Sequence, residues 1–190
     1  MSAMIFHRLR LINKNQRGFT LIEILVALAI TGLITGGITG TIFQVITIEA
    51  RTSNHMTAVR QVQNAGFWVS RDATMAQTVD LEWQGETPSG SKFPLKLTWT
   101  EWDNNEKYEV IYTLQNMIGG PKQLQRQHLT YDADGYEIGN ETTILAQYII
   151  PGVGQTRLDF TDGKLTLTVT ATVERQSETR TYEVIPRPGM

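Results

Sequence analysis

A nearly uncharged stretch of 30 residues close to the start of the chain most constrains what this protein can fold into. Between Phe19 and Ile48 the only ionisable side chain is that of Glu23. An apolar run of about 20 residues is long enough to cross a bilayer as a helix. Residues 24–48 exceed that length without a charge, so the sequence predicts a single membrane-spanning helix.

The residues before this stretch are basic. Residues 1–18 contain no acid and four cationic side chains, which are Arg8, Arg10, Lys14 and Arg17. Because basic residues flank membrane helices on the cytoplasmic side, we expect the N-terminus inside and the later residues outside. A secretory signal cleaved near Ala29 is the alternative. However, the apolar run continues far beyond Ala29, where a processed protein should become polar.

Composition excludes several classes of protein. The chain has no cysteine, which excludes disulfides, thiolate metal sites and cysteine nucleophiles. Its three scattered histidines and formal charge of −2 argue against a histidine metal site and against binding to nucleic acid. No nucleophile elbow and no paired His and Asp are recognisable. We therefore expect no enzymatic activity and no cofactor.

The segment Gly18-Phe19-Thr20-Leu21-Ile22-Glu23 follows the basic leader and opens the apolar stretch. This combination resembles the processing site of type IV prepilins. The resemblance implies that a prepilin peptidase cuts after Gly18 and methylates the new amino terminus at Phe19. It also implies three further partners, namely other pilin or pseudopilin subunits, an inner-membrane assembly platform, and membrane lipid before assembly.

Glu23 is a costly residue near the start of a membrane helix unless it is paired. It can reach the lipid headgroups, or it can form an ion pair with a cation from another chain. The resemblance implies the second role, in which Glu23 neutralises the amine of Phe19 in a neighbouring subunit during assembly.

Four glycines weaken the apolar helix, since each costs about 1 kcal/mol relative to alanine. They are Gly32, Gly36, Gly37 and Gly40. Small residues allow close helix packing, and they also allow the helix to unwind. The resemblance favours a flexible segment here, although the helix-breaking proline of many major pilins is missing.

The helix is expected to continue beyond the membrane to about Val79. One apolar stripe at helical spacing supports this, formed by Val59, Val62, Gly66, Val69, Ala73 and Ala76. We expect this face to pack on the protein's own sheet, with a strand or a bulky aromatic residue close to Gly66.

A period of two replaces the helical period in the second half of the chain. Alternating apolar residues predict strands over 95–100, 108–114 and 165–174, and residues 181–185 are expected to form the last one. The turn residues Asp162-Gly163 predict a hairpin with residues 156–161, and residues 86–91 predict a loop. About six or seven strands, without helical crossovers, indicate an antiparallel sheet.

The predicted fold class is α+β, a long N-terminal helix packed against an antiparallel sheet. We divide the chain into a leader (1–18), a membrane helix (19–48), its amphipathic continuation (49–79) and a β-rich head (80–190). The head without a cysteine pair and the Arg71-Asp72 pair near the helix end resemble minor pilins. Among these, the chain is most similar to the J-type pseudopilin of type II secretion and its type IV pilus counterpart.

Two features of the predicted head are candidate binding sites. Asp132 and Asp134 beside a glycine suit calcium, although hairpin turns use the same residues. The aromatic residues Trp99, Trp102, Tyr108 and Tyr112 could form a binding strip, but sheet packing explains them better, with Trp102 facing outward.

Two other functional classes stay open at this stage. The head could belong to a competence or adhesive pilin that captures DNA or a surface. Alternatively, the chain could be an anchored enzyme or sensor domain whose N-terminus resembles a prepilin by accident.

Overall fold

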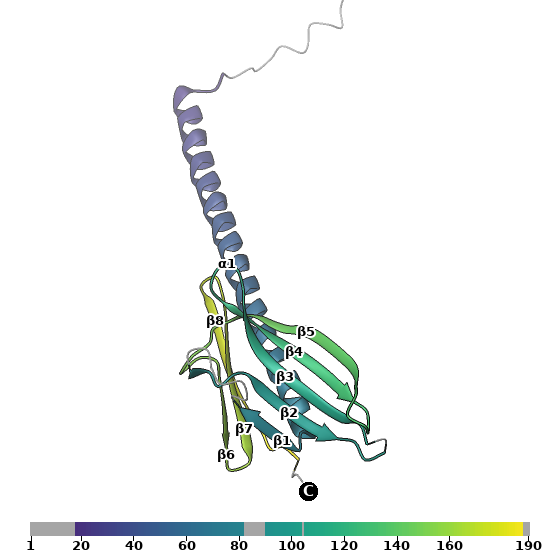
Figure 1. Cartoon of the computed structure of the whole chain (residues 1–190). Helices are drawn as coiled ribbons and strands as arrows, with labels where there is room; N and C mark the ends of the chain where they lie inside the picture. The colour runs from purple at the N-terminus through teal and green to yellow at the C-terminus, as the bar shows by residue number, and fades with distance from the viewer. Residues whose placement is uncertain (1–17, 82–89, 104, 188–190) are drawn as a thin grey trace, which may run out of the picture. The chain divides into compact units, whose positions relative to one another are not determined.

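The computed structural model describes residues 18–81, 90–103 and 105–187 (Figure 1). The predicted leader, apart from Gly18, lies outside the described residues. So does the predicted loop over 86–91, apart from its last two residues. The fold is α+β, as predicted, with one long helix and an antiparallel sheet.

In the described part of the chain, the one α-helix, α1, runs from Leu21 to Met75. By its internal contacts the chain divides into two units between Ile48 and Glu49, within this helix. The prediction that the helix reaches Val79 is wrong. After Met75 the backbone N–H of Gln77 donates to the carbonyl of Thr98, and the β-branched residues that follow join a strand.

The described residues form eight strands in one sheet. They are β1 (Thr78–Leu81), β2 (Leu95–Thr100), β3 (Lys107–Asn116), β4 (Lys122–Tyr131), β5 (Glu137–Ile149), β6 (Arg157–Thr161), β7 (Lys164–Val173) and β8 (Gln176–Val184). Every strand pairing is antiparallel. The count exceeds the predicted six or seven partly because β1 takes residues that were assigned to the helix.

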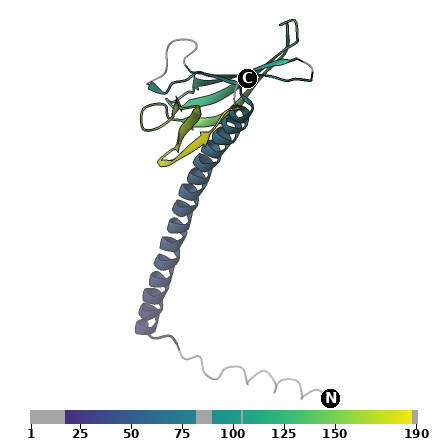
Figure 2. The same cartoon turned by 90° about the horizontal axis from the view of Figure 1, so that it is seen from below.

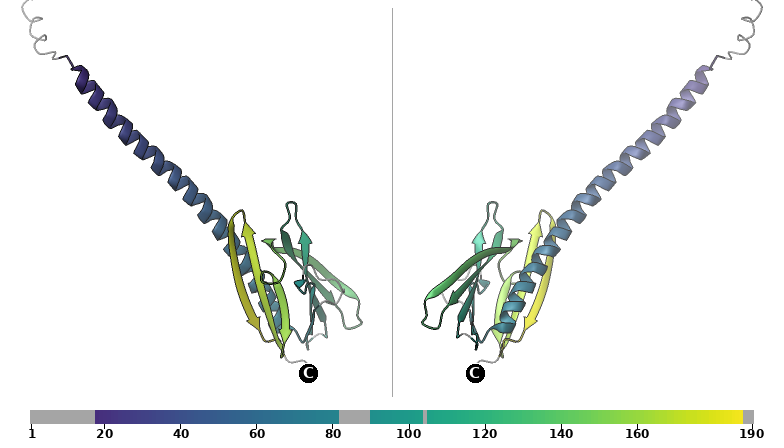
Figure 3. Two further views of the ribbon diagram at one scale, coloured as in Figure 1. Left: turned by 90° about the vertical axis from the view of Figure 1, so that its left-hand side faces the viewer. Right: turned by 90° about the vertical axis from the view of Figure 1, so that its right-hand side faces the viewer.

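Strand β7 joins the two parts of the sheet. Along one edge it pairs with β8, and along the other it pairs first with β6 and then, at Ala171, with Ile149 of β5. Figure 3 shows the result, in which β6–β8 and β2–β5 are inclined to each other. Residues 49–75 of α1 lie against the concave side of this curled sheet (Figure 2).

The alternating patterns predict the buried faces well. Leu95, Leu97, Leu165 and Leu167 are all buried, as their spacing indicates. Asp162 and Gly163 both have positive φ, which is the conformation of the predicted two-residue hairpin turn. The last strand is longer than expected, because Gln176–Val184 pair with β7 along their whole length.

The packed part of α1 presents the predicted stripe to the sheet. Val62, Val69 and Ala73 are fully buried, while Val59 is half-buried. A Cβ atom at Gly66 would overlap the ring of Tyr182, whose hydroxyl donates to the carbonyl of Val62. The expected close approach of an aromatic residue to Gly66 is confirmed, and it fixes α1 against β8.

Candidate functional site

The predicted processing site lies at the exposed beginning of the described chain. Gly18 and Phe19 precede the helix, and no neighbouring atom comes within 4 Å of a Cβ placed at Gly18. Nothing in the part of the chain that the structure describes therefore requires glycine at this position. The Phe19 ring is also exposed, at 79%, so the bond between the two residues is open to another protein.

Thr20 and Glu23 form a reciprocal pair at the start of α1. The N–H of Glu23 donates to Oγ1 of Thr20 at 3.3 Å, and the N–H of Thr20 donates to Oε2 of Glu23 at 3.5 Å. This is a capping box, which satisfies two backbone donors that a helix start leaves open. The capping box was not among the predicted features, although the Thr-x-x-Glu spacing is its sequence signature.

The first half of α1 is apolar on every side and makes no packing contacts. Every residue from Leu21 to Ile48 is exposed, including Leu21, Leu33 and Phe43, at 68–82%. By length and composition α1 is able to cross a membrane. A helix that is apolar all round is stable in lipid or inside a protein assembly, because water cannot solvate such a surface favourably.

The glycines of this half face open space. A Cβ at Gly32, Gly36, Gly37 or Gly40 would meet no atom within 4 Å. Between them Thr31, Thr35 and Thr39 donate their hydroxyls to the carbonyls four residues earlier, each at 2.8 Å. Such back-bonding weakens and bends helices slightly, which adds to the cost of the glycines. The helix is nevertheless continuous here in the single chain.

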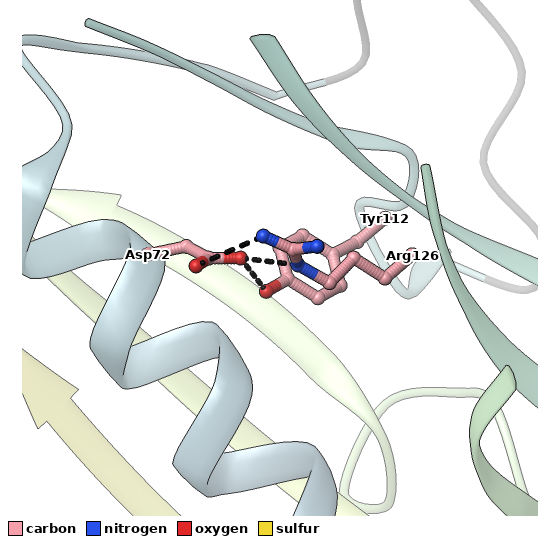
Figure 4. A network of polar contacts seen from close by, with 3 residues as sticks. All are labelled: Asp72, Tyr112 and Arg126. Carbon is pink, nitrogen blue, oxygen red and sulfur yellow. Dashed lines mark hydrogen bonds and ion pairs between the residues drawn. The ribbon is translucent and has the colours of Figure 1, made fainter. Parts of the chain in front are cut away.

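Arg71 and Asp72, the adjacent pair near the end of α1, make separate contacts. The guanidinium of Arg71 lies 5.1 Å from the ring centroid of Trp68. Asp72 points the other way, into the sheet, where Arg126 Nε donates to its Oδ2 at 2.7 Å and Arg126 Nη2 to its Oδ1 at 3.3 Å. Figure 4 shows that the hydroxyl of Tyr112 is the third donor to this carboxylate.

Burial makes this network strong. Asp72 is 2% exposed and Tyr112 is fully buried. Burial, reinforced by the Asp72 carboxylate, raises the pKa of Tyr112 well above its ordinary value. Burial opposes the charge on Arg126, but the bond to Asp72 outweighs it and raises the pKa of Arg126. Both donors thus keep their protons, and the network ties α1 to β3 and β4.

The aromatic residues of the head mostly pack within the sheet, as expected. Trp99 is 8% exposed and Tyr112 is buried, whereas Trp102 is 66% exposed. The ring of Trp99 stacks on that of Tyr108, and Tyr108 stacks in turn on His128. Only Trp102 among the four predicted residues is available to a partner.

Asp132 and Asp134 occupy the turn between β4 and β5. One oxygen of Asp132 accepts the N–H groups of Asp134 and Tyr136, at 3.0 and 2.8 Å. This is a side-chain turn of the kind that aspartate often stabilises. Among the described residues no three His, Cys, Asp or Glu side chains gather into a metal-binding group. The calcium hypothesis stays a prediction.

Residues 13–39 match the family model described as the prokaryotic N-terminal methylation motif. No curated protein and no solved structure gives a significant match to the chain. The motif covers the predicted cleavage site, the capping box and three of the four glycines in the first half of α1, all but Gly40. It supports a type IV pilin-like family, with processing by a prepilin peptidase, assembly with other subunits, and a single-pass membrane anchor.

Proposed function

We propose that this chain is a structural subunit, a minor pilin or pseudopilin, of a type IV pilus or a type II secretion pseudopilus. A prepilin peptidase removes residues 1–18 and methylates Phe19. Before assembly, α1 anchors the subunit in the inner membrane with its N-terminus in the cytoplasm. The methylation motif at residues 13–39 is the observation that carries the proposal.

Glu23 has one role before assembly, in the capping box, and another after assembly, in an ion pair with a neighbouring subunit. In the single chain the carboxylate of Glu23 reaches the N–H of Thr20 over a long 3.5 Å bond. Cleavage after Gly18 creates a cationic amine at Phe19. A carboxylate and an ammonium group that are each costly in lipid become less costly together. The Glu23 side chain therefore turns from its own helix start to the Phe19 amine of a neighbouring subunit, and so sets the axial register.

The exposed first half of α1 provides the rest of the assembly surface. Its apolar side chains are exposed on all sides, so they can exchange lipid for neighbouring helices without losing contacts inside the chain. The glycines and back-bonded threonines make the middle of this half the easiest part to unwind in a filament. The role we propose is structural rather than enzymatic, without a bound cofactor.

Cleavage is tested by the intact mass and N-terminal sequence of the chain, produced with and without a prepilin peptidase. We expect a peptidase-dependent loss of residues 1–18 and one added methyl group at Phe19. Gly18→Val should block the cut, because its side chain obstructs close approach of the peptidase to the backbone. Gly37→Val is the matched control and should be cut normally. An uncut chain, or a cut near Ala29, would contradict the proposal.

The role of the Glu23 charge is separable from that of the cap. Glutamine also fits the capping box, so Glu23→Gln keeps the cap and removes the charge, whereas Glu23→Ala removes both. We expect both variants to insert into the membrane and both to be lost from purified filaments. Normal incorporation of Glu23→Gln would show that only the cap matters.

A further inference from the structure

Strand β5 has an edge that no other strand covers. β4 pairs with one side of β5 along its length, whereas β7 meets the other side only at Ile149. The backbone of Glu137–Ile144 on that side has no strand partner within the described part of the chain. Figure 1 shows β5 as the outermost strand of the β2–β5 layer.

Helix α1 takes the place of a strand where this open edge ends. Asn64 donates to the carbonyl of Leu145, and Gln61 accepts the N–H of Gln147 at 2.7 Å. A groove of about 460 Å³ lies here, lined by Arg60, Gln63 and Phe67 of α1 as well as by Leu145. The ring of Phe67 is 59% exposed. Helix α1 thus covers the edge of β5 from Leu145 onward, and residues 137–144 of that edge stay uncovered by any described strand.

The same head has a second open edge. Within the described residues strand β8 pairs with β7 alone, so no strand described here covers its outer side along Gln176–Val184. Because β5 and β8 are both antiparallel to β7, they run in the same direction. An open edge is a template for pairing with another chain. The open edges of β5 and β8 are of nearly equal length and are longer than the edge strands β1 and β6.

The direction of α1 decides which edges meet. Pairing β5 with β5 of a second copy about a two-fold axis would be antiparallel. The packed segments 49–75 of the two copies would then run in opposite directions. Pairing β5 with β8 is parallel, so the packed segments of the two copies keep roughly the same direction, apart from the rotation that the inclination of β8 to β5 requires. Subunits that enter one filament in the same orientation need the second arrangement, a step that rests on the proposed function.

We propose that the open edge of β5 binds β8 of a second copy of this chain, so that the sheet continues from head to head. Aligning Glu137 with Gln176 pairs the whole open edge. This register places Glu141 beside Arg180 and Thr142 beside Thr181, and it sets no two like charges opposite each other. Glu141 and Arg180 both lie on the concave face, because Glu141 is opposite His128 and Arg180 is opposite Val169. A heterologous contact of this kind joins copies head to tail, in a closed ring or an open row.

The absence of cysteine from the sequence makes a disulfide test clean. Two differently tagged full-length copies are co-expressed in membranes, one with Asn140→Cys and the other with Thr179→Cys. Neighbouring strands lie about 4.8 Å apart, within the Cα separation that a disulfide accepts. We expect a mixed disulfide-linked dimer under mild oxidation. The control pairs Asn140→Cys with Thr168→Cys, on the same face one strand inward, and should give none.

Charge variants test the register. Arg180→Glu should reduce the yield of the dimer, and a chain with both Glu141→Arg and Arg180→Glu should restore it. A dimer linked through Asn140→Cys in both copies would overturn the proposal in favour of a two-fold contact. Absence of any crosslink overturns it as well. The intact mass of the same samples separates the two hypotheses, since a processed, methylated chain without crosslinks leaves the proposed function standing.

Discussion

The two halves of α1 belong to one continuous helix but obtain their stability from different surroundings. In residues 21–48 no side chain is buried, and glycine and threonine are spread among large apolar residues. In residues 49–75 a single stripe is buried against the sheet, and it includes Val62, Val69 and Asp72. A stripe predicts packing inside the chain, and an apolar surface on every side predicts packing outside it. The apolar side chains of residues 21–48 therefore need lipid or other subunits to cover them, whereas the apolar stripe of residues 49–75 is already covered by the sheet of the same chain.

The comparison predicts that an acid in the packed half supports the fold and that an acid in the exposed half does not. Asp72→Ala leaves the Arg126 cation buried without its carboxylate. The expected loss is on the order of 3–5 kcal/mol in the free energy of unfolding. Glu23→Ala should leave head unfolding unchanged. Thermal unfolding of the full chain in detergent, followed by near-ultraviolet circular dichroism, measures both. Equal unfolding midpoints for the two variants would contradict the different roles assigned to the acids in the two halves of α1.

The difference between the two halves of α1 could be predicted from the sequence, but the contacts that hold the packed half in place could not. The motif at Gly18, the buried strand faces and the close approach at Gly66 follow from local spacing, which one sequence displays. The partner of Asp72 does not, because Arg126 lies 54 positions away and several arginines were equally available. The end of the helix was missed for a similar reason, since pairing of Gln77 with a distant strand overrides local periodicity. The capping box was the one local signal left unused.

The same substitution in each half offers a second test. Gly66→Ala inserts a methyl group into the ring of Tyr182 and should destabilise the head by about 1–3 kcal/mol through overpacking. Gly36→Ala meets no atom within 4 Å, so the midpoint of head unfolding should not move. Unfolding midpoints of the two variants beside the wild-type chain measure this difference. A Gly66→Ala head as stable as the wild type would show that β8 can move away from α1 at little cost.

The smallest predicted effect concerns pH and belongs to the head, on which the packed half of α1 lies. Burial, with the nearby Arg126 cation, lowers the pKa of His128 and outweighs the Asp72 and Glu141 carboxylates. Below an ordinary histidine pKa of about 6.5, the unfolded chain therefore binds a proton that the folded head does not. Stability should fall as the pH drops through this value towards the lower pKa of the folded state.

His128→Gln should flatten that dependence of stability on pH, whatever its effect on stability at neutral pH through lost stacking on Tyr108. The matched control is His55→Gln, which removes a histidine at an exposed position of α1 and leaves the surroundings of His128 intact. Chemical unfolding between pH 8 and pH 5 measures the slopes, and an unaltered slope in His128→Gln would assign the acid sensitivity to other groups of the head.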